Sequence, residues 1–179
     1  WKSDGSEAGT QLVSNLGQAD GPAGVWDMTA LGNTLLFVGR TGRLNYGLYR
    51  SDGTAAGTRL VRDFSYVNDP GTSRIYPPLG NLRAIGNRLY FLQSGQLWSS
   101  DGTTAGTAAV SELPASELAG LGERAFTLAH TQPGGLDLLQ AGVASNPIIT
   151  TIAPTLSLPA GKLAAAGGRL FIGVNGDKG

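Results

Sequence analysis

An all-β fold is predicted for this chain, and within that class a β-propeller built from four-stranded antiparallel blades of about 45 to 49 residues. The first observation is a phrase, Ser-Asp-Gly-Ser/Thr-x-x-Gly-Thr, that occurs three times with its aspartates, Asp4, Asp52 and Asp101, 48 and 49 residues apart. The second is the count of 28 glycines and 9 prolines, which favours short strands and frequent turns. The third is the run of consecutive apolar residues in several predicted strands, which indicates burial on both faces.

The strands of one repeat can be written in order. A first strand over 25–31 turns at Gly32 and Asn33 into a second strand over 34–38. A variable loop leads to a third strand over 48–51, and the Asp-Gly loop leads to an outer strand over 59–64. The turn and second strand recur as LGNTLLFVG, IGNRLYFLQ, LGERAFTLA and AGGRLFIGV. The stretch 116–128 opens like a helix, but its glycines and its place in the repeat favour strands.

These repeats divide the chain into five parts. We expect an outer half-blade over 1–16, blades over 17–64 and 65–113, a degenerate blade over 114–152, and an inner half-blade over 153–179. The two half-blades are complementary, so they could close a four-bladed ring. Alternatively, the chain is a stretch of a larger propeller, and we favour that alternative.

The degenerate blade lacks the aspartate phrase. Aligning Gly142 with Gly102 places Ala141 at the aspartate and Asn146 at the second glycine. Asparagine is a frequent substitute for glycine in the left-handed region, so we expect Asn146 to keep the backbone geometry of the turn.

The segments LYRSDGTAAGTRLVRD and LWSSDGTTAGTAAVSE resemble the ELWxxDGT repeat of large secreted and surface proteins of bacteria. The resemblance covers about three quarters of the chain, with Gly47 and Gln96 in place of the leading glutamate. It implies a propeller-like protein that is secreted or attached to the bacterial cell surface or envelope. It implies no particular reaction.

The aspartates have two interpretations. The one we favour is structural: Asp4, Asp52 and Asp101 each form an Asx-turn, and Gly57, Gly106 and Asn146 let the chain return. The other is a calcium site, although each loop offers few of the six to eight oxygens that calcium requires. No cofactor is expected under the first interpretation, and calcium under the second.

Candidate binding residues lie at the opposite edge of the blades. In an up-and-down blade the repeated turns share one rim, and the unlike loops share the other. Variable loops on a uniform scaffold are typical of binding surfaces. The candidates on this variable rim are Arg40, Arg43, Tyr46, Tyr66, Asp69, Arg74, Tyr76 and His130.

Composition excludes several function classes. Thirteen basic and thirteen acidic residues cancel, which argues against a nucleic-acid partner. There is no cysteine, so disulfides and thiol catalysis are excluded, and no apolar run is long enough for a membrane helix. A protein or a glycan at the cell surface is the expected partner, within a larger chain or assembly.

The function predicted from these features is a non-enzymatic extracellular repeat module for adhesion, assembly or ligand binding. A first alternative is a propeller enzyme, a hydrolase or lyase, that acts on polysaccharide with carboxylates such as Asp20, Asp69 and Asp177. A second alternative is a structural repeat stiffened by calcium. No catalytic residue is assigned, because the single histidine, His130, has no identified partner.

Overall fold

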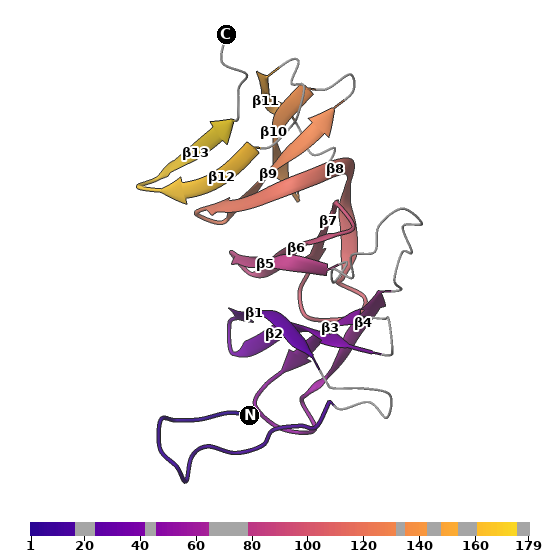
Figure 1. Ribbon diagram of the computed structural model, residues 1–179, viewed down its shortest axis with the longest axis vertical. Coiled ribbons are helices and arrows are strands. Elements are labelled where there is room, and N and C mark those ends of the chain that lie inside the picture. The colour runs from indigo at the N-terminus through magenta and orange to yellow at the C-terminus, as the bar shows by residue number, and fades with distance from the viewer. Residues whose placement is uncertain are drawn as a thin grey trace.

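The structure, a computed structural model, describes residues 1–16, 24–41, 46–64, 79–131, 135–142, 148–153 and 161–174. Over these ranges the chain is all-β and contains no helix (Figure 1). The strands are β1 Val25–Leu31, β2 Thr34–Arg40, β3 Tyr46–Ser51, β4 Arg59–Phe64, β5 Leu79–Ile85, β6 Arg88–Gln93, β7 Gln96–Ser100, β8 Ala108–Leu121, β9 Arg124–Thr131, β10 Gly135–Ala141, β11 Ile148–Ala153, β12 Gly161–Ala166 and β13 Arg169–Val174.

The strands form three antiparallel sheets. One sheet has the order β1-β2-β3-β4, a second runs from β5 to β11 in chain order, and a third contains β12 and β13. The units follow one another along the long axis of the molecule, with residues 1–16 at the bottom, β1–β4 and then β5–β7 above them, and β9–β13 at the top (Figure 1). No sheet is closed on itself, and the two expected half-blades do not meet.

The first repeat has the predicted strands. β1 and β4 have the bounds expected from the sequence, while β2 and β3 each extend two residues further, to Arg40 and from Tyr46. The extension is stabilised by pairing of Arg40 with Tyr46, and by a hydrogen bond from the Tyr49 hydroxyl to the Arg40 carbonyl oxygen at 3.1 Å.

The second and third repeats share a strand, which the expected division into separate blades had not anticipated. β8 is 14 residues long; its first part pairs with β7 and its second part, from Ala115, pairs with β9. The expected boundary between 113 and 114 therefore lies inside a continuous strand. No turn-forming pair separates the two repeats there, so the chain has no reason to leave the extended conformation. The expectation of strands rather than a helix over 116–128 is confirmed.

We name the repeats by their strands: the first unit is β1–β4, the second β5–β8, the third β8–β11 and the fourth hairpin β12–β13. Residues 1–16 form the N-terminal hairpin, in which Lys2 pairs with Gln11.

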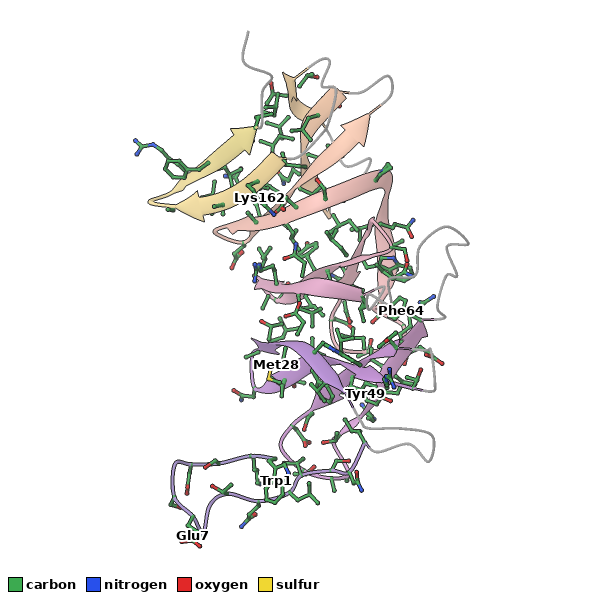
Figure 2. The ribbon with its side chains drawn as sticks, viewed as in Figure 1. Trp1, Glu7, Met28, Tyr49, Phe64 and Lys162 are labelled. Atoms are coloured by element: carbon green, nitrogen blue, oxygen red, sulfur yellow. The ribbon has the colours of Figure 1, made fainter. Side chains whose placement is uncertain are left out.

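The hydrophobic core lies between consecutive units (Figure 2). One cluster joins Leu36 and Val38 of the first unit to Leu79 and Phe91 of the second. A second cluster joins the second and third units, and a third joins the third unit to Leu163 of the fourth hairpin. Apolar side chains on both faces of a strand are thus buried against different partners, as the consecutive apolar runs predicted.

No helix in the described part of the chain is long and apolar enough to cross a membrane.

Candidate functional site

The three aspartate loops have the same hydrogen bonds. In the third loop, Asp101 Oδ1 accepts hydrogen bonds from the amide of Thr103 at 2.8 Å and from its hydroxyl at 2.7 Å. The Thr103 hydroxyl oxygen in turn accepts the amide hydrogen of Gly106, and the Thr107 hydroxyl donates to the Thr103 carbonyl oxygen. Matching bonds hold the loops of Asp4 and Asp52. The predicted Asx-turn is present in every described copy.

The two glycines of the loop are required for different structural reasons. The first glycine has a positive φ in each copy, +94° at Gly5, +86° at Gly53 and +85° at Gly102. The second glycine, Gly57 or Gly106, does not have a positive φ. A Cβ atom added there would overlap the carboxyl group of Asp52 or Asp101. The second glycine is therefore required by the aspartate side chain rather than by the backbone.

The degenerate repeat keeps the first glycine of the loop. Gly142 has φ +77°, as its alignment with Gly102 predicts. Because Ala141 replaces the aspartate, no carboxyl group requires a glycine four residues after Gly142. The expectation that Asn146 keeps the backbone geometry of the turn stays a prediction from the sequence. Asn146 itself lies outside the described residues.

Hydrogen bonding lowers the pKa of each loop aspartate. The hydroxyl and then the amide of Ser6, Thr54 and Thr103 stabilise the ionised carboxylates, so the pKa values of Asp4, Asp52 and Asp101 fall below the ordinary range. The carboxylates are at the surface, where water screens their interactions. Nearby charges therefore lower these pKa values less than the hydrogen bonds do.

A calcium shell is not assembled by the described residues. Within them, no group of three or more His, Asp or Glu side chains could hold a metal ion. In each aspartate loop, Oδ1 of the aspartate already accepts two hydrogen bonds. Only the first of the three loops contains a second carboxylate, that of Glu7. The calcium interpretation for Asp4, Asp52 and Asp101 gains no support from this geometry.

The third aspartate loop also attaches the second unit to the first. Thr104 of the third loop donates a hydrogen bond to the Val61 carbonyl oxygen on β4 at 2.8 Å. In return, Arg62 donates to the Thr107 carbonyl oxygen at 2.8 Å, and its guanidinium lies 4.8 Å from the ring centroid of Trp98. Gly102 approaches Leu36 on β2. In this copy the phrase therefore makes contacts between units as well as forming the turn.

The aromatic residue that precedes each phrase belongs to the core in the complete units. Tyr49 is buried and stacks on Phe37, with 5.5 Å between ring centroids. Trp98 packs edge-on against Phe64 of the preceding unit at 5.1 Å. Both rings therefore pack in the hydrophobic core rather than facing a ligand. Trp1, at the same position of the first copy, is exposed (Figure 2).

Two of the expected binding residues, Arg40 and Tyr46, lie side by side where β2 and β3 face the variable rim. The Tyr46 ring is only 2% exposed and packs edge-on against Trp26 at 5.0 Å. Tyr46 is therefore a core residue, contrary to the expectation that it would face a ligand. Arg40 covers both rings, with its guanidinium carbon 5.9 Å from the Trp26 centroid, and is partly exposed.

The remaining rim candidates fall where the structure gives no side-chain description. Arg43, Tyr66, Asp69, Arg74 and Tyr76 lie outside the described residues. For His130 only the backbone is described; it pairs with Leu136 between β9 and β10. Their roles stay predictions from the sequence.

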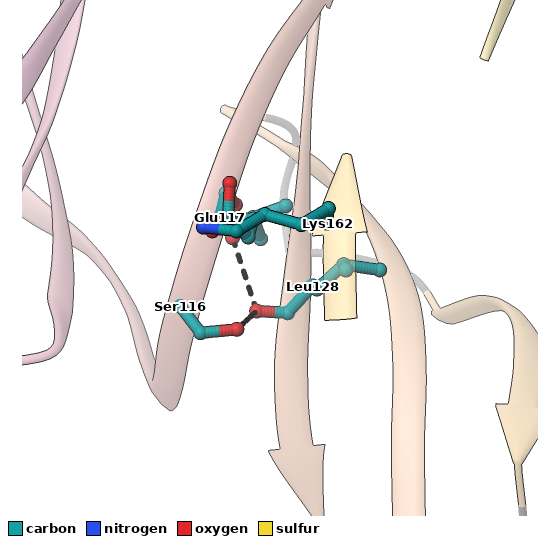
Figure 3. A network of polar contacts seen from close by, with 5 residues as sticks. Ser116, Glu117, Leu128 and Lys162 are labelled. Carbon is teal, nitrogen blue, oxygen red and sulfur yellow. Dashed lines mark hydrogen bonds and ion pairs between the residues drawn. The ribbon is translucent and has the colours of Figure 1, made fainter. Parts of the chain in front are cut away.

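Sequence analysis missed a row of polar residues on the first strands. Asp27, Asn81, Glu117 and Lys162 each stand four residues before the end of the first strand of their unit. Asp27 Oδ2 accepts the amide hydrogen of Leu82 in the next unit at 2.9 Å, and Lys162 forms an ion pair with Glu117 at 2.6 Å (Figure 3). Aligning the four hairpin phrases and reading upstream would have revealed this row.

The row coincides with irregular pairing. The register shifts between Trp26 and Met28 in β1, and equivalent shifts occur in β5 and β8. Asp27 and Asn81 have positive φ values of 20° and 58°. The bulges at Asp27 and Glu117 turn their carboxylates toward the adjacent unit.

No protein-family model matches the chain, and no curated protein matches it.

Proposed function

We propose that the chain is a non-enzymatic extracellular repeat module, of the propeller type, that binds a cell-surface protein or glycan through the loops of its variable rim. The observation that carries the proposal is the use of the repeated phrase. Its polar groups bond within the loop or to the preceding unit, as the Asp101 loop does through Thr103, Thr104 and Thr107. The phrase is a scaffold element, and recognition is left to the segments that differ between repeats.

The strand ends at the variable rim support these separate roles, scaffold for the repeated phrase and recognition for the variable loops. Arg40 ends β2, Tyr46 begins β3 and Phe64 ends β4, and these residues are paired across the sheet. Buried aromatic rings at this edge fix the points from which residues 42–45 and 65–78 depart. Loops that start from rigid strand ends lose less entropy on binding than loops on a mobile base.

Binding measurements with loop variants test the proposal. Immobilised bacterial surface polysaccharides and intact cells serve as probes for the purified chain. We expect saturable binding that falls at least about tenfold when Arg43, Arg74 and Tyr76 are replaced together by alanine, because polar and aromatic contacts of this kind contribute about 1 kcal/mol or more each. Arg83→Ala, an exposed arginine on β5 outside these loops, is the matched control and should leave binding unchanged.

The same polysaccharide probes distinguish binding from catalysis. Release of reducing ends or unsaturated products from any probe polysaccharide would contradict the non-enzymatic proposal and favour the hydrolase or lyase alternative. Loss of binding with Asp52→Asn at an unchanged melting temperature would also contradict it, because that result would move recognition to the repeated loop.

A further inference from the structure

The Arg40 side chain is held in place without an acceptor for its hydrogens. Its guanidinium carbon lies 5.9 Å from the ring centroid of Trp26 and 6.0 Å from that of Tyr46. Its Nε atom is buried, and no hydrogen bond or ion pair reaches this side chain from the residues that the structure describes. A buried N–H group without an acceptor is unfavourable, and more so where the group is charged.

Two other arginines show that this arrangement is unusual. Arg62 also lies over aromatic rings, but it donates a hydrogen bond to the Thr107 carbonyl oxygen at 2.8 Å. Arg50 also has a buried Nε atom without a partner, but the Asp52 carboxylate attracts its charge. Among the described arginines, only Arg40 combines contacts to aromatic rings with a buried Nε atom that lacks a partner.

The acidic residue near the same end of the first sheet faces away from Arg40. Asp63 on β4 pairs with Gly47, whereas Arg40 pairs with Tyr46. Because successive side chains of a strand point to opposite faces, Asp63 and Arg40 lie on opposite faces of the sheet. The Asp63 carboxylate also accepts a hydrogen bond from the Thr41 hydroxyl at 2.6 Å. Asp63 is therefore not the counter-ion of Arg40.

The position of Arg40 places it beside the segments proposed for recognition. It is the last residue of β2, close to the variable loop of residues 42–45. Trp26 and Tyr46 belong to the core cluster between the first and second units, so the rings that hold the arginine are themselves fixed. Because a fixed guanidinium has little side-chain entropy left to lose, binding through it costs less free energy. Arg40 is therefore presented at the variable rim in a form ready to bind an anion.

We propose that Arg40 binds a carboxylate of an acidic polysaccharide. The guanidinium presents its donors in a planar fork that matches the two oxygens of a carboxylate. A uronic acid carries its carboxylate directly on the sugar ring, so it has less rotamer entropy to lose than an aspartate or glutamate of a protein partner. The partly buried Trp26 ring offers apolar surface beside the arginine for the C–H face of the sugar. This inference rests on the proposed function, because it names the ligand class and one binding residue of the same rim.

The Nε–H signal of Arg40 in nitrogen–proton NMR spectra tests the contact in the unmodified chain, and its loss in Arg40→Lys assigns it. The probe is trigalacturonate, and its methyl ester is the matched probe without charge. We expect a saturable shift with trigalacturonate, half complete at about 1 mM or below, as for a weak single site. The methyl ester should leave the signal in place, and the Nε–H signal of the exposed Arg83 should not respond to either probe.

Binding to immobilised polygalacturonate measures the same contact on a polymer. Arg40→Gln removes the charge and should weaken binding at least about tenfold. Arg40→Lys keeps the charge but lacks the fork, so it should restore only part of the affinity. Arg83→Ala is the matched control and should leave binding unchanged. The melting temperature of each variant is measured alongside, so that a loss of binding is not mistaken for a loss of folding.

Three results would overturn the inference: an Arg40 signal that stays in place up to about 10 mM trigalacturonate, equal shifts with the acid and its methyl ester, or tighter binding of an oligoglutamate peptide. The last result would assign the site to an acidic protein. If the loop variant of Arg43, Arg74 and Tyr76 still loses cell binding, the proposed function stands although this inference fails. An Arg40 response without any loss in that variant would count against the proposed loops and not against Arg40.

Discussion

At the scale of single residues, the repeated loop depends on a steric match between an aspartate and the glycine five residues after it. Asp101 occupies the space that a Cβ atom on Gly106 would need. The degenerate repeat has lost both partners together, with Ala141 and Asn146 at these positions. A local phrase that looks like a ligand site can therefore be explained by packing and hydrogen bonds within the loop.

Gly106→Ala should destabilise the protein by about 1 to 2 kcal/mol, because the Asp101 carboxylate must move and give up its hydrogen bonds to Thr103. Urea unfolding measures the change. In an Asp101→Ala background the same substitution should cost about 0.5 kcal/mol or less, since the conflict is gone. Gly80→Ala, where a Cβ atom would meet nothing within 4 Å, is the control. Equal costs in both backgrounds would contradict the steric explanation.

The loop aspartates also predict a dependence on pH. A pKa that is lower in the folded than in the unfolded protein stabilises the fold above the unfolded value, about pH 4, and this contribution is lost as pH falls through the folded pKa. Thr54→Val removes the hydroxyl that lowers the pKa of Asp52 most, so that pKa should rise toward its ordinary value.

Carboxyl carbon chemical shifts followed by NMR between pH 6 and 2, a range of about four units around the carboxylate values, measure the pKa directly. Ala55→Val adds a branched side chain one residue further along and should leave the pKa of Asp52 unchanged. A Thr54→Val protein with an unaltered Asp52 titration would show that the hydroxyl is not the cause.

At the scale of elements, strand β4 and the loop before β8 hold the first two units together. Arg62 on β4 combines a hydrogen bond to the Thr107 carbonyl oxygen with a position over the Trp98 ring. The ion pair of Glu117 and Lys162 joins β8 to β12, but its lysine is exposed and such pairs contribute at most about 1 kcal/mol.

Arg62→Ala should lower the free energy of unfolding by about 2 kcal/mol, through loss of both the hydrogen bond and the cation–π contact. Chemical denaturation, followed by tryptophan fluorescence because Trp98 lies at the interface, measures it. Arg59→Ala on the same strand removes an exposed arginine and should change stability by less than about 0.5 kcal/mol. Similar losses for both variants would argue against a specific contact between units.

At the scale of the whole molecule, the core consists of three clusters that each join neighbouring units. Stability in such an arrangement is a sum of unit and interface contributions, and the terminal elements have fewer interfaces. The N-terminal hairpin and β12–β13 are the terminal elements (Figure 1).

Amide hydrogen exchange should therefore be fastest in the N-terminal hairpin and in β12–β13, and slowest in β6 and β9, which have strands on both sides and units above and below. Mass spectrometry of peptides measures this at low protein concentration. Equal protection across all units would show that the molecule unfolds as a single cooperative body rather than as a stack.

Much of the local structure was predictable from the sequence because it depends on neighbours in the chain. The hairpins at Gly32 and Gly86 follow from a glycine at the turn position that needs positive φ, and the Asx-turns follow from Asp, Gly and Thr at fixed offsets. Tyr46 was misassigned because a polar-tipped aromatic beside a variable loop has the same sequence signature whether it faces solvent or, as here, Trp26.

By itself, then, the sequence determined the all-β class, the strands of the first unit and the turn chemistry of the repeated phrase, since backbone sterics and short-range hydrogen bonds decide these. Only the tertiary structure decided that β8 belongs to two repeats, that Gly106 makes room for Asp101, and that Asp27 and Glu117 reach the following unit. These are contacts between residues brought together by stacking, and stacking depends on the shape of whole sheets rather than on spacing along the chain.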